Sequence, residues 1–276
     1  MTEFLQQYMP IISSEMGHLG DNLSGLVHWL MLVLFVGWGT FFIIALIKFR
    51  SSKNPKASYN GITNHYSSYV EGAVVAVEAL LLVGFAIPGY YTVKYDKVID
   101  TSLDEVEVRV IAQQFAWNIH YPGVDGKFGI TRANLVEEAE NPIGLDREGF
   151  GADDIVTVNQ LHLPVDKQIK LYISSKDVIH GFALPEMRIK QDAIPGMQVP
   201  IYFTPTMTSE EFLAKLKGTP RENMGYEIAC AQLCGNSHYR MKGYMTIHNE
   251  QEYNQWLLEE AEELDSEGDD EWDDEW

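Results

Sequence analysis

Residues 26–47 read LVHWLMLVLFVGWGTFFIIALI, an apolar run that contains no Asp, Glu, Lys or Arg. A helix rises about 1.5 Å per residue, so a run of this length can cross a hydrocarbon core about 30 Å thick. The run therefore predicts a membrane-spanning helix, and the segments on either side of it should lie outside the bilayer.

A second apolar run, residues 72–93, follows after a short linker and is interrupted by Glu78 and Pro88. Its hydropathy favours a second span over a buried helix. The linker holds four basic residues and no acidic residue before Glu71, and these basic residues are Lys48, Arg50, Lys53 and Lys56. The positive-inside rule places such a linker in the cytoplasm. We expect a helical hairpin over residues 24–95 with both chain termini on the outer side.

Residues 1–23 contain no Lys or Arg, and no small-residue cleavage site precedes a short apolar core. A removed signal peptide would carry basic residues near its start and such a cleavage site. No cysteine lies near the N-terminus to carry a lipid. The first span is therefore expected to be a retained anchor, preceded by an outward-facing segment.

The formal net charge of −20 argues against nucleic acid as a partner, because phosphate backbones are bound by basic surfaces. More than half of this charge lies in residues 259–275, which contain twelve acidic residues and no basic one. We expect residues 251–276 to form a C-terminal helix and acidic tail. The low-complexity part after residue 259, which includes Trp272 and Trp276, is predicted to be disordered.

From about residue 104 the pattern changes to short β-rich runs separated by turn residues. No long amphipathic helix lies among them, so residues 104–250 predict a β-sandwich or barrel. A stretch rich in Gly, Asn, Asp and Glu, residues 125–154, is expected to be a long surface insertion. The predicted strands are residues 106–111, 169–173, 199–203, 226–229 and 244–247.

Both cysteines lie in CAQLCGNSHYRM, residues 230–241, which has the spacing Cys-x3-Cys-x3-His-x2-Met. Two such cysteines could form a disulfide in an oxidising compartment, and Cys, Cys and His are also ordinary zinc ligands. Neither possibility uses Met241. Thiolate, imidazole and thioether together suit copper in electron transfer. Two thiolates can bridge two copper ions, an arrangement that needs a second histidine besides His238.

The upstream segment SSKDVIHGFALP offers His180, which we expect to end a strand and open a loop. Besides His238 the chain has seven histidines, and chemistry alone does not separate His180 from the other six. A further pattern lies just beyond it, where residues 190–196 read Lys-x-Asp-x-x-Pro-Gly.

Taken together, the Cys-Cys-His-Met motif, the upstream Ser-x-Asp-Val-x-His and this third pattern resemble subunit II of haem-copper cytochrome c oxidases. The likeness covers nearly the whole chain. It implies a two-helix transmembrane hairpin followed by an all-β cupredoxin-type (Greek-key) barrel domain. It also implies a binuclear CuA centre of two copper ions, whose ligands would be His180, Cys230, the backbone carbonyl of Gln232, Cys234, His238 and Met241.

The same resemblance implies a function. Such a chain accepts electrons from cytochrome c, or from an equivalent haem c donor, and relays them to subunit I, where oxygen is reduced to water in a proton-translocating terminal oxidase. Subunits I and III and the lipid bilayer are the implied partners. The implied location is the bacterial inner membrane, with the copper domain on the periplasmic side. No Cys-x-x-Cys-His haem-attachment motif is present, so the donor haem is expected on another protein.

Two alternatives stay open at this point. One is the electron-accepting subunit of a CuA-type nitric oxide reductase, and the other is a membrane-tethered copper-binding module.

The chain departs from the family pattern at several positions. Where the family commonly has a glutamate that also reaches a magnesium ion, this chain has Gln232, and a neutral amide is a poorer ligand for a hard cation. Magnesium is therefore doubtful. Phe115 stands where a tryptophan is thought to receive the electron, and Trp117 matches a later aromatic residue. Both are candidates for electron uptake, with plain core packing as the alternative.

Two acidic residues lie in or beside the second span. Glu71 resembles the family's glutamate at the mouth of a proton channel in subunit I. Glu78 has no counterpart in the family, and an ionisable group within a span indicates a functional role by default. It could extend a proton path or pair with a basic group of a neighbouring subunit.

Overall fold

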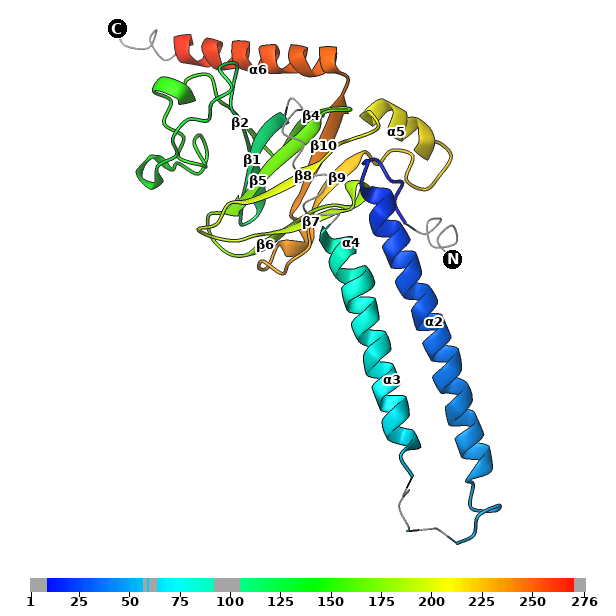
Figure 1. Cartoon of the computed structure of the whole chain (residues 1–276). Helices are drawn as coiled ribbons and strands as arrows, with labels where there is room; N and C mark the ends of the chain where they lie inside the picture. Colours follow the sequence, from blue (N-terminus) through cyan, green and yellow to red (C-terminus); the bar gives the residue numbers. More distant parts are fainter. Residues whose placement is uncertain (1–8, 57–58, 60–63, 92–104, 271–276) are drawn as a thin grey trace. The chain divides into compact units, whose positions relative to one another are not determined.

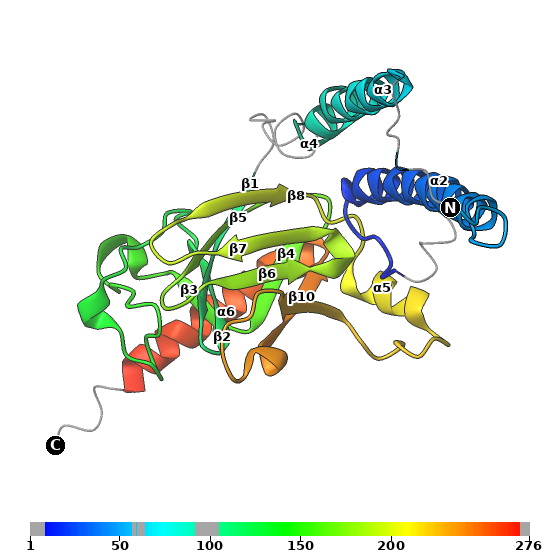
Figure 2. The same cartoon turned by 90° about the horizontal axis from the view of Figure 1, so that it is seen from below.

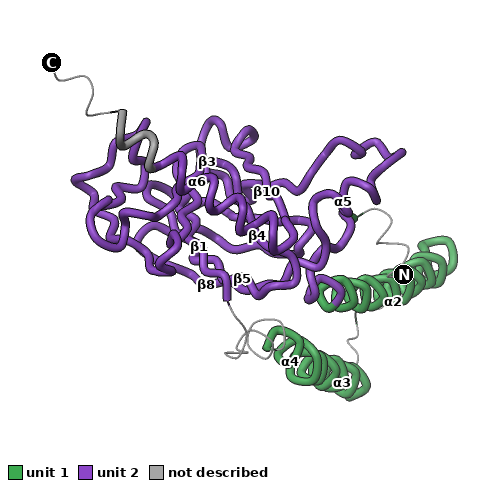
Figure 3. Tube along the Cα trace, turned by 90° about the horizontal axis from the view of Figure 1, so that it is seen from above, with its two compact units in different colours: residues 1–9, 19–99 green, residues 10–18, 100–276 purple. Residues whose placement is uncertain are grey.

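The computed structural model describes residues 9–56, 59, 64–91 and 105–270, with side chains described up to residue 264 (Figure 1). The chain divides into two compact units (Figure 3). The helical unit comprises residues 1–9 and 19–99, and the β-unit comprises residues 10–18 and 100–276.

Two long apolar helices make up the described residues of the helical unit. The first is α2 (Gly17–Lys48), and the second runs from Tyr66 to Tyr91 as α3 (Tyr66–Leu81), a π-helical turn η1 (Leu82–Ala86) and α4 (Ile87–Tyr91). Both are long and apolar enough to cross a membrane. Their apolar stretches are not buried within the chain, as expected for surfaces that face lipid.

The π-helical turn has a local cause in the sequence. Pro88 has no backbone N–H, and its ring crowds the carbonyl four residues earlier, which widens or kinks a helix. The N–H of Ile87 bonds the carbonyl of Leu82, five residues back, in place of the usual partner. The second span therefore remains helical through its proline.

In the part of the chain that the structure describes, the β-unit is built from two five-stranded sheets, which confirms the predicted cupredoxin-type barrel (Figure 2). The first sheet has the order β3-β2-β1-β5-β8, with β1 and β5 parallel. The second has the order β4-β10-β9-β6-β7, with β4 and β10 parallel. The strands are β1 (Glu105–Gln113), β2 (Ala116–Tyr121), β3 (Ile155–Val158), β4 (Gln160–Pro164), β5 (Gln168–Ser175), β6 (His180–Leu184), β7 (Ile189–Ala193), β8 (Val199–Phe203), β9 (Tyr226–Cys230) and β10 (Lys242–His248).

All five predicted strands are confirmed, as β1, β5, β8, β9 and β10. The position expected for His180 was wrong, because this residue begins β6 and does not end a strand. The chain turns at Asp177–Ile179, and the residues after it pair with β7 and β9. His180 is consequently fully buried at the start of a central strand.

The core lies between the two sheets. Alternate residues of β5 are buried, and Ile169, Leu171 and Ile173 are completely inaccessible. Each such side chain stabilises the fold by about 1.5–3 kcal/mol relative to an exposed one. The core fixes the relative positions of the ends of β6, β9 and β10. The predicted ligands lie at or beside these ends.

The insertion predicted at residues 125–154 connects β2 to β3, and it is partly buried. Ile143 and Leu145 pack inward, and Asp154 at its end is fully buried against His120 of β2. The Asp154 carboxylate accepts bonds from His120 Nε2 at 2.5 Å and from the Gly129 amide at 2.7 Å. These contacts fasten the insertion to the first sheet.

The segment before the first helix belongs to the β-unit. Ser13 donates its amide to the Glu186 carbonyl at 2.9 Å, its own carbonyl accepts from the Thr206 amide at 2.9 Å, and the Ser14 hydroxyl donates to the Met187 carbonyl at 2.7 Å. Residues 10–18 therefore lie on the same side of a membrane as the β-unit. An even number of spans must separate them, as a two-helix hairpin requires.

The prediction of disorder after residue 259 was wrong for the described part of the tail, because α6 (Glu250–Asp270) continues as one helix. Asn249 caps it by accepting a bond from the Glu252 amide at 2.9 Å. Tyr253 and Trp256 bury its first turns against the barrel. Glu, Leu and Ala are strong helix formers, so the acidic composition does not prevent a helix. Trp272 and Trp276 lie outside the described residues.

Candidate metal centre

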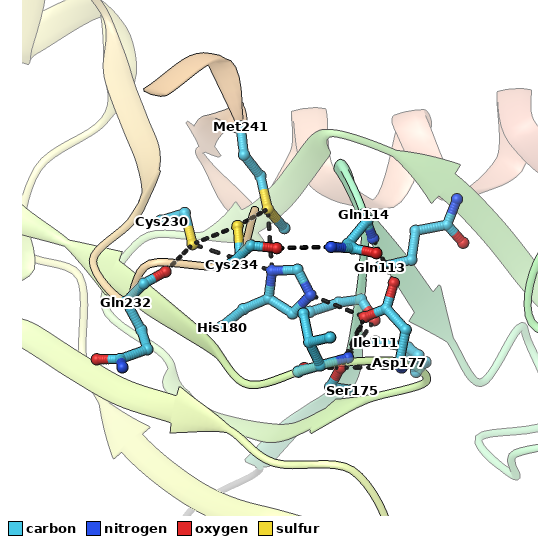
Figure 4. Close-up of polar contacts among 12 residues, drawn as sticks. Ile111, Gln113, Gln114, Ser175, Asp177, His180, Cys230, Gln232, Cys234 and Met241 are labelled. Carbon is cyan, nitrogen blue, oxygen red and sulfur yellow. Dashed lines mark hydrogen bonds and ion pairs between the residues drawn. The ribbon is translucent and has the colours of Figure 1, made fainter. Parts of the chain in front are cut away.

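The predicted copper ligands come from three strand ends and the loops beside them (Figure 4). His180 begins β6, Cys230 ends β9, and Cys234 lies in the following loop. His238 opens a short 3-10 turn, and Met241 immediately precedes β10. The Cys230 amide donates to the Met241 carbonyl at 3.3 Å, so the loop between them closes on itself.

The sulfur and nitrogen atoms of these side chains converge. The two cysteine Sγ atoms lie 3.6 Å apart, and both cysteines are free thiols. His180 Nδ1 lies 4.0 Å from Cys230 Sγ, and His238 Nδ1 lies 3.5 Å from Cys234 Sγ. The Met241 sulfur is 3.1 Å from His180 Nδ1 and 3.8 Å from Cys234 Sγ. His180, Cys230 and Cys234 form a group with the spacing of metal ligands.

The Gln232 carbonyl oxygen also faces this cluster, 3.2 Å from Cys230 Sγ. The side chain of Gln232 is exposed to solvent. All six groups predicted to bind copper are thus close together, while their role as ligands stays a prediction.

The orientation of His180 is set by the carboxylate of Asp177, three residues before it, which was not predicted to have a role at the site. Asp177 Oδ1 accepts a bond from His180 Nε2 at 2.9 Å, which leaves the lone pair of Nδ1 facing the sulfur atoms. Burial tends to raise the pKa of Asp177, but bonds from His180 and from the amides of Gln114 and Val178 outweigh it, so the pKa lies below its ordinary value. Asp177 therefore holds one tautomer of His180.

The Cys234 thiol favours protonation while no cation is near. Burial, together with a hydrogen bond from Cys230, raises the pKa of Cys234 to about 11. A bound metal ion would reverse this preference, since a coordinating thiol is deprotonated. Metal binding at this cluster should therefore release protons.

The two candidate aromatic residues occupy different environments. Trp117 is fully buried, and its ring meets His180 edge-on at a centroid distance of 6.1 Å and Phe182 at 5.3 Å. Phe115 is only partly buried and lies beside Gly235, where an added Cβ would come within 3.1 Å of its ring. Of the two, Phe115 lies nearer solvent and contacts the cysteine loop.

Apolar side chains surround the open face of the cluster. Leu233, between the two cysteines, is 78% exposed, and Val178 and Ile179 of the His180 loop are also exposed. These residues line one shallow hollow together with Gln232 and Gly235. An exposed apolar rim around this cluster is a suitable contact surface for another protein.

Glu71 and Glu78 belong to α3 in the helical unit, and both are exposed within the chain. Their predicted roles in a proton path therefore depend on groups outside this chain.

A cupredoxin-type domain with a clustered His, two Cys and Met, attached to two apolar helices, defines the class of membrane-anchored copper domains. The family model described as the periplasmic domain of cytochrome c oxidase subunit II matches residues 106–248, more than half of the chain. The chain belongs to the cytochrome c oxidase subunit II family and is a subunit of an oxidase enzyme.

The chain is also similar to individual proteins. The chain is 29% identical to the alternative cytochrome c oxidase subunit 2 of Bradyrhizobium diazoefficiens, over 89% of this chain and 81% of the relative. It is 36% identical to cytochrome c oxidase subunit 2 of Thermostichus vulcanus, over 38% of this chain and 27% of that protein. The crystal structure of the periplasmic domain of subunit II (CoxB) of Bradyrhizobium japonicum matches with 24% identity and a TM-score of 0.39, covering 59% of this chain and 96% of that one.

Proposed function

We propose that this chain receives electrons at a binuclear CuA centre and passes them to subunit I of the oxidase, where oxygen is reduced to water. The observation that carries the proposal is the pair of free thiols 3.6 Å apart with one imidazole nitrogen beside each. A disulfide would use only the two cysteines. Zinc would leave Met241 unused, because a thioether is a poor zinc ligand.

The chain's residues divide naturally between two metal ions. Cys230 and Cys234 would bridge both. His180 Nδ1 and the Met241 sulfur lie 3.1 Å apart and so would serve one ion. His238, on the other side of Cys234, and the Gln232 carbonyl would serve the second. A copper pair bridged in this way shares one electron between two metals.

The protein's contribution is to hold these groups still. His180 and Met241 are buried, and Asp177 fixes the His180 ring through a 2.9 Å bond. Ligands that keep their positions in both oxidation states lower the reorganisation energy of electron transfer. The ligand cluster therefore functions as a relay and leaves oxygen chemistry to subunit I.

The donor would be cytochrome c, or a haem c domain of another protein, docking over the apolar rim. Phe115 is the proposed residue for electron uptake, since it is only partly buried and its ring lies beside Gly235 of the cysteine loop. Subunits I and III would bind the helical unit, and Glu71 would lie at the mouth of a proton channel. Magnesium does not form part of the proposal, because the Gln232 amide is a weak ligand for it.

The proposed location is a bacterial inner membrane, with the β-unit and both termini in the periplasm. The basic linker between the helices supports this orientation. The hydrogen bonds of residues 10–18 with Glu186, Thr204 and Thr206 support a narrower part of it, that this segment lies on the same side of the membrane as the β-unit.

The test is electron transfer in the purified oxidase complex. Reduced cytochrome c, mixed rapidly with the complex, should reduce the copper centre before the haems of subunit I, and oxygen consumption should follow. Reduction of the haems with no earlier copper phase would contradict the relay. Turnover with nitric oxide in place of oxygen would instead indicate the reductase alternative.

A further inference from the structure

We infer that Gln114 is a positioning residue that holds the two ligand loops of the centre in register. This inference rests on the proposed function. Gln114 lies in the two-residue turn between β1 and β2, on the sheet opposite to the one that carries the ligands. It contacts both ligand loops at once (Figure 4).

The first contact is made by the side chain. Gln114 Nε2 donates to the Cys234 carbonyl at 2.7 Å, across 120 residues of sequence. This bond fixes the peptide group of a bridging cysteine, and with it the direction in which that thiol points.

Gly235 makes this approach possible. Its φ of +135° lies in the region that favours glycine. A Cβ at this position would come within 2.8 Å of Gln114 Nε2 and 3.1 Å of the Phe115 ring. A side chain at residue 235 would therefore displace the Gln114 amide group from its place beside the cysteine loop, and the positive φ also favours glycine here.

The second contact is made by the backbone. The Gln114 amide donates to Asp177 Oδ2 at 2.6 Å, and the other oxygen of Asp177 accepts from His180 Nε2 at 2.9 Å. Gln114 thus connects Cys234, through its side chain, with Asp177 and His180, through its amide. Movement of either loop must break one of these bonds.

The neighbouring glutamine provides a matched control. Side chains alternate in direction along a strand, and Gln113 Oε1 accepts from Asn118 Nδ2 at 3.1 Å, away from the ligand loops. Gln113→Met and Gln114→Met make the same chemical change one residue apart. Methionine keeps the length of glutamine and removes its amide donor.

The experiment uses the purified oxidase complex and reads copper content, the electron paramagnetic resonance spectrum and the copper midpoint potential. Gln114→Met should keep two copper ions but lose the equivalence of the two nuclei, and should release copper to a competing chelator about fivefold faster, as expected for one lost hydrogen bond. Gln114→Glu should have a larger effect, because it sets an acceptor against the Cys234 carbonyl. Gln113→Met should match the wild type.

A wild-type spectrum, potential and release rate in Gln114→Met would overturn the positioning role, as would equal changes in Gln113→Met. If Gln114→Met does not assemble, Gln114→Asn tests the same contact, because its side chain is one methylene shorter and its amide group does not reach the Cys234 carbonyl. A wild-type complex without a shared-electron copper signal would instead refute the proposed function, so the two failures are distinguishable.

Discussion

Asp177→Asn should weaken copper binding without unfolding the β-unit. The two oxygens of the Asp177 carboxylate accept hydrogen bonds from different donors. Oδ1 accepts from His180 Nε2 at 2.9 Å, and Oδ2 accepts from the Gln114 backbone amide at 2.6 Å. Asparagine can supply an acceptor at only one of these positions. Its NH2 group must then face an N–H donor, which loses its partner.

The size of the effect follows from this geometry. An orphaned donor costs about 1–3 kcal/mol, which corresponds to roughly 5–150-fold in an equilibrium constant. Loss of the carboxylate partner of a metal-binding histidine typically reduces metal affinity 10–100-fold. We therefore expect copper affinity to fall by about 10–100-fold. The midpoint potential should rise, because a nearby negative charge that stabilises the oxidised centre is removed.

Competition between the purified complex and a copper chelator measures the affinity, and a redox titration measures the potential. Asp166→Asn is the control, since Asp166 is an exposed turn residue with a φ of 58° that asparagine also tolerates. Copper affinity within twofold of the wild type in Asp177→Asn would show that the carboxylate does not support His180.

Three further predictions concern other parts of the chain. Met241→Leu should retain copper while shifting the midpoint potential, and an unchanged potential and transfer rate would reduce Met241 to core packing. Burial, reinforced by His248, lowers the pKa of His162 to about 4. The packing of Trp256 on the neutral His162 ring should therefore be fully stable above about pH 6.5 and should weaken as the pH falls toward 4. Trp256 fluorescence that stays constant over this range would refute this prediction. Removing residues 259–276 should leave the copper spectrum intact and lower the rate of reduction by a basic soluble cytochrome c. This loss of rate should be smaller at high salt, where the Debye length falls below about 8 Å. A full rate at low salt would exclude electrostatic capture by this segment.

The features predicted from sequence are those with strong local patterns. The two apolar runs and the alternating strands such as β5 follow directly from residue order, because burial on one face imposes a period. β2 and β6 were not predicted. They are almost entirely buried, and β2 carries Asn118 and His120 into the core, so neither shows alternation.

The ligand set came from spacing and family resemblance, whereas the groups that position it were missed. Asp177 and Gln114 meet across 63 residues, and Gln114 and Cys234 meet across 120. No local pattern reports such contacts, since they depend on how the sheets are stacked. A C-terminal helix was predicted, but its continuation after residue 259 was missed, because the acidic composition suggested disorder there. The apolar contacts of Tyr253 and Trp256 fasten the first turns of this helix to the barrel.

The proposal of a shared dicopper centre is tested most directly by electron paramagnetic resonance of the oxidised, purified complex, with Cys234→Ser alongside the wild type. The two thiols 3.6 Å apart predict a wild-type spectrum with hyperfine structure from two equivalent copper nuclei. They also predict its loss in Cys234→Ser, because a serine hydroxyl does not replace a bridging thiolate. A wild-type spectrum from a single copper nucleus, or a two-nucleus spectrum that survives in Cys234→Ser, would contradict the bridged centre.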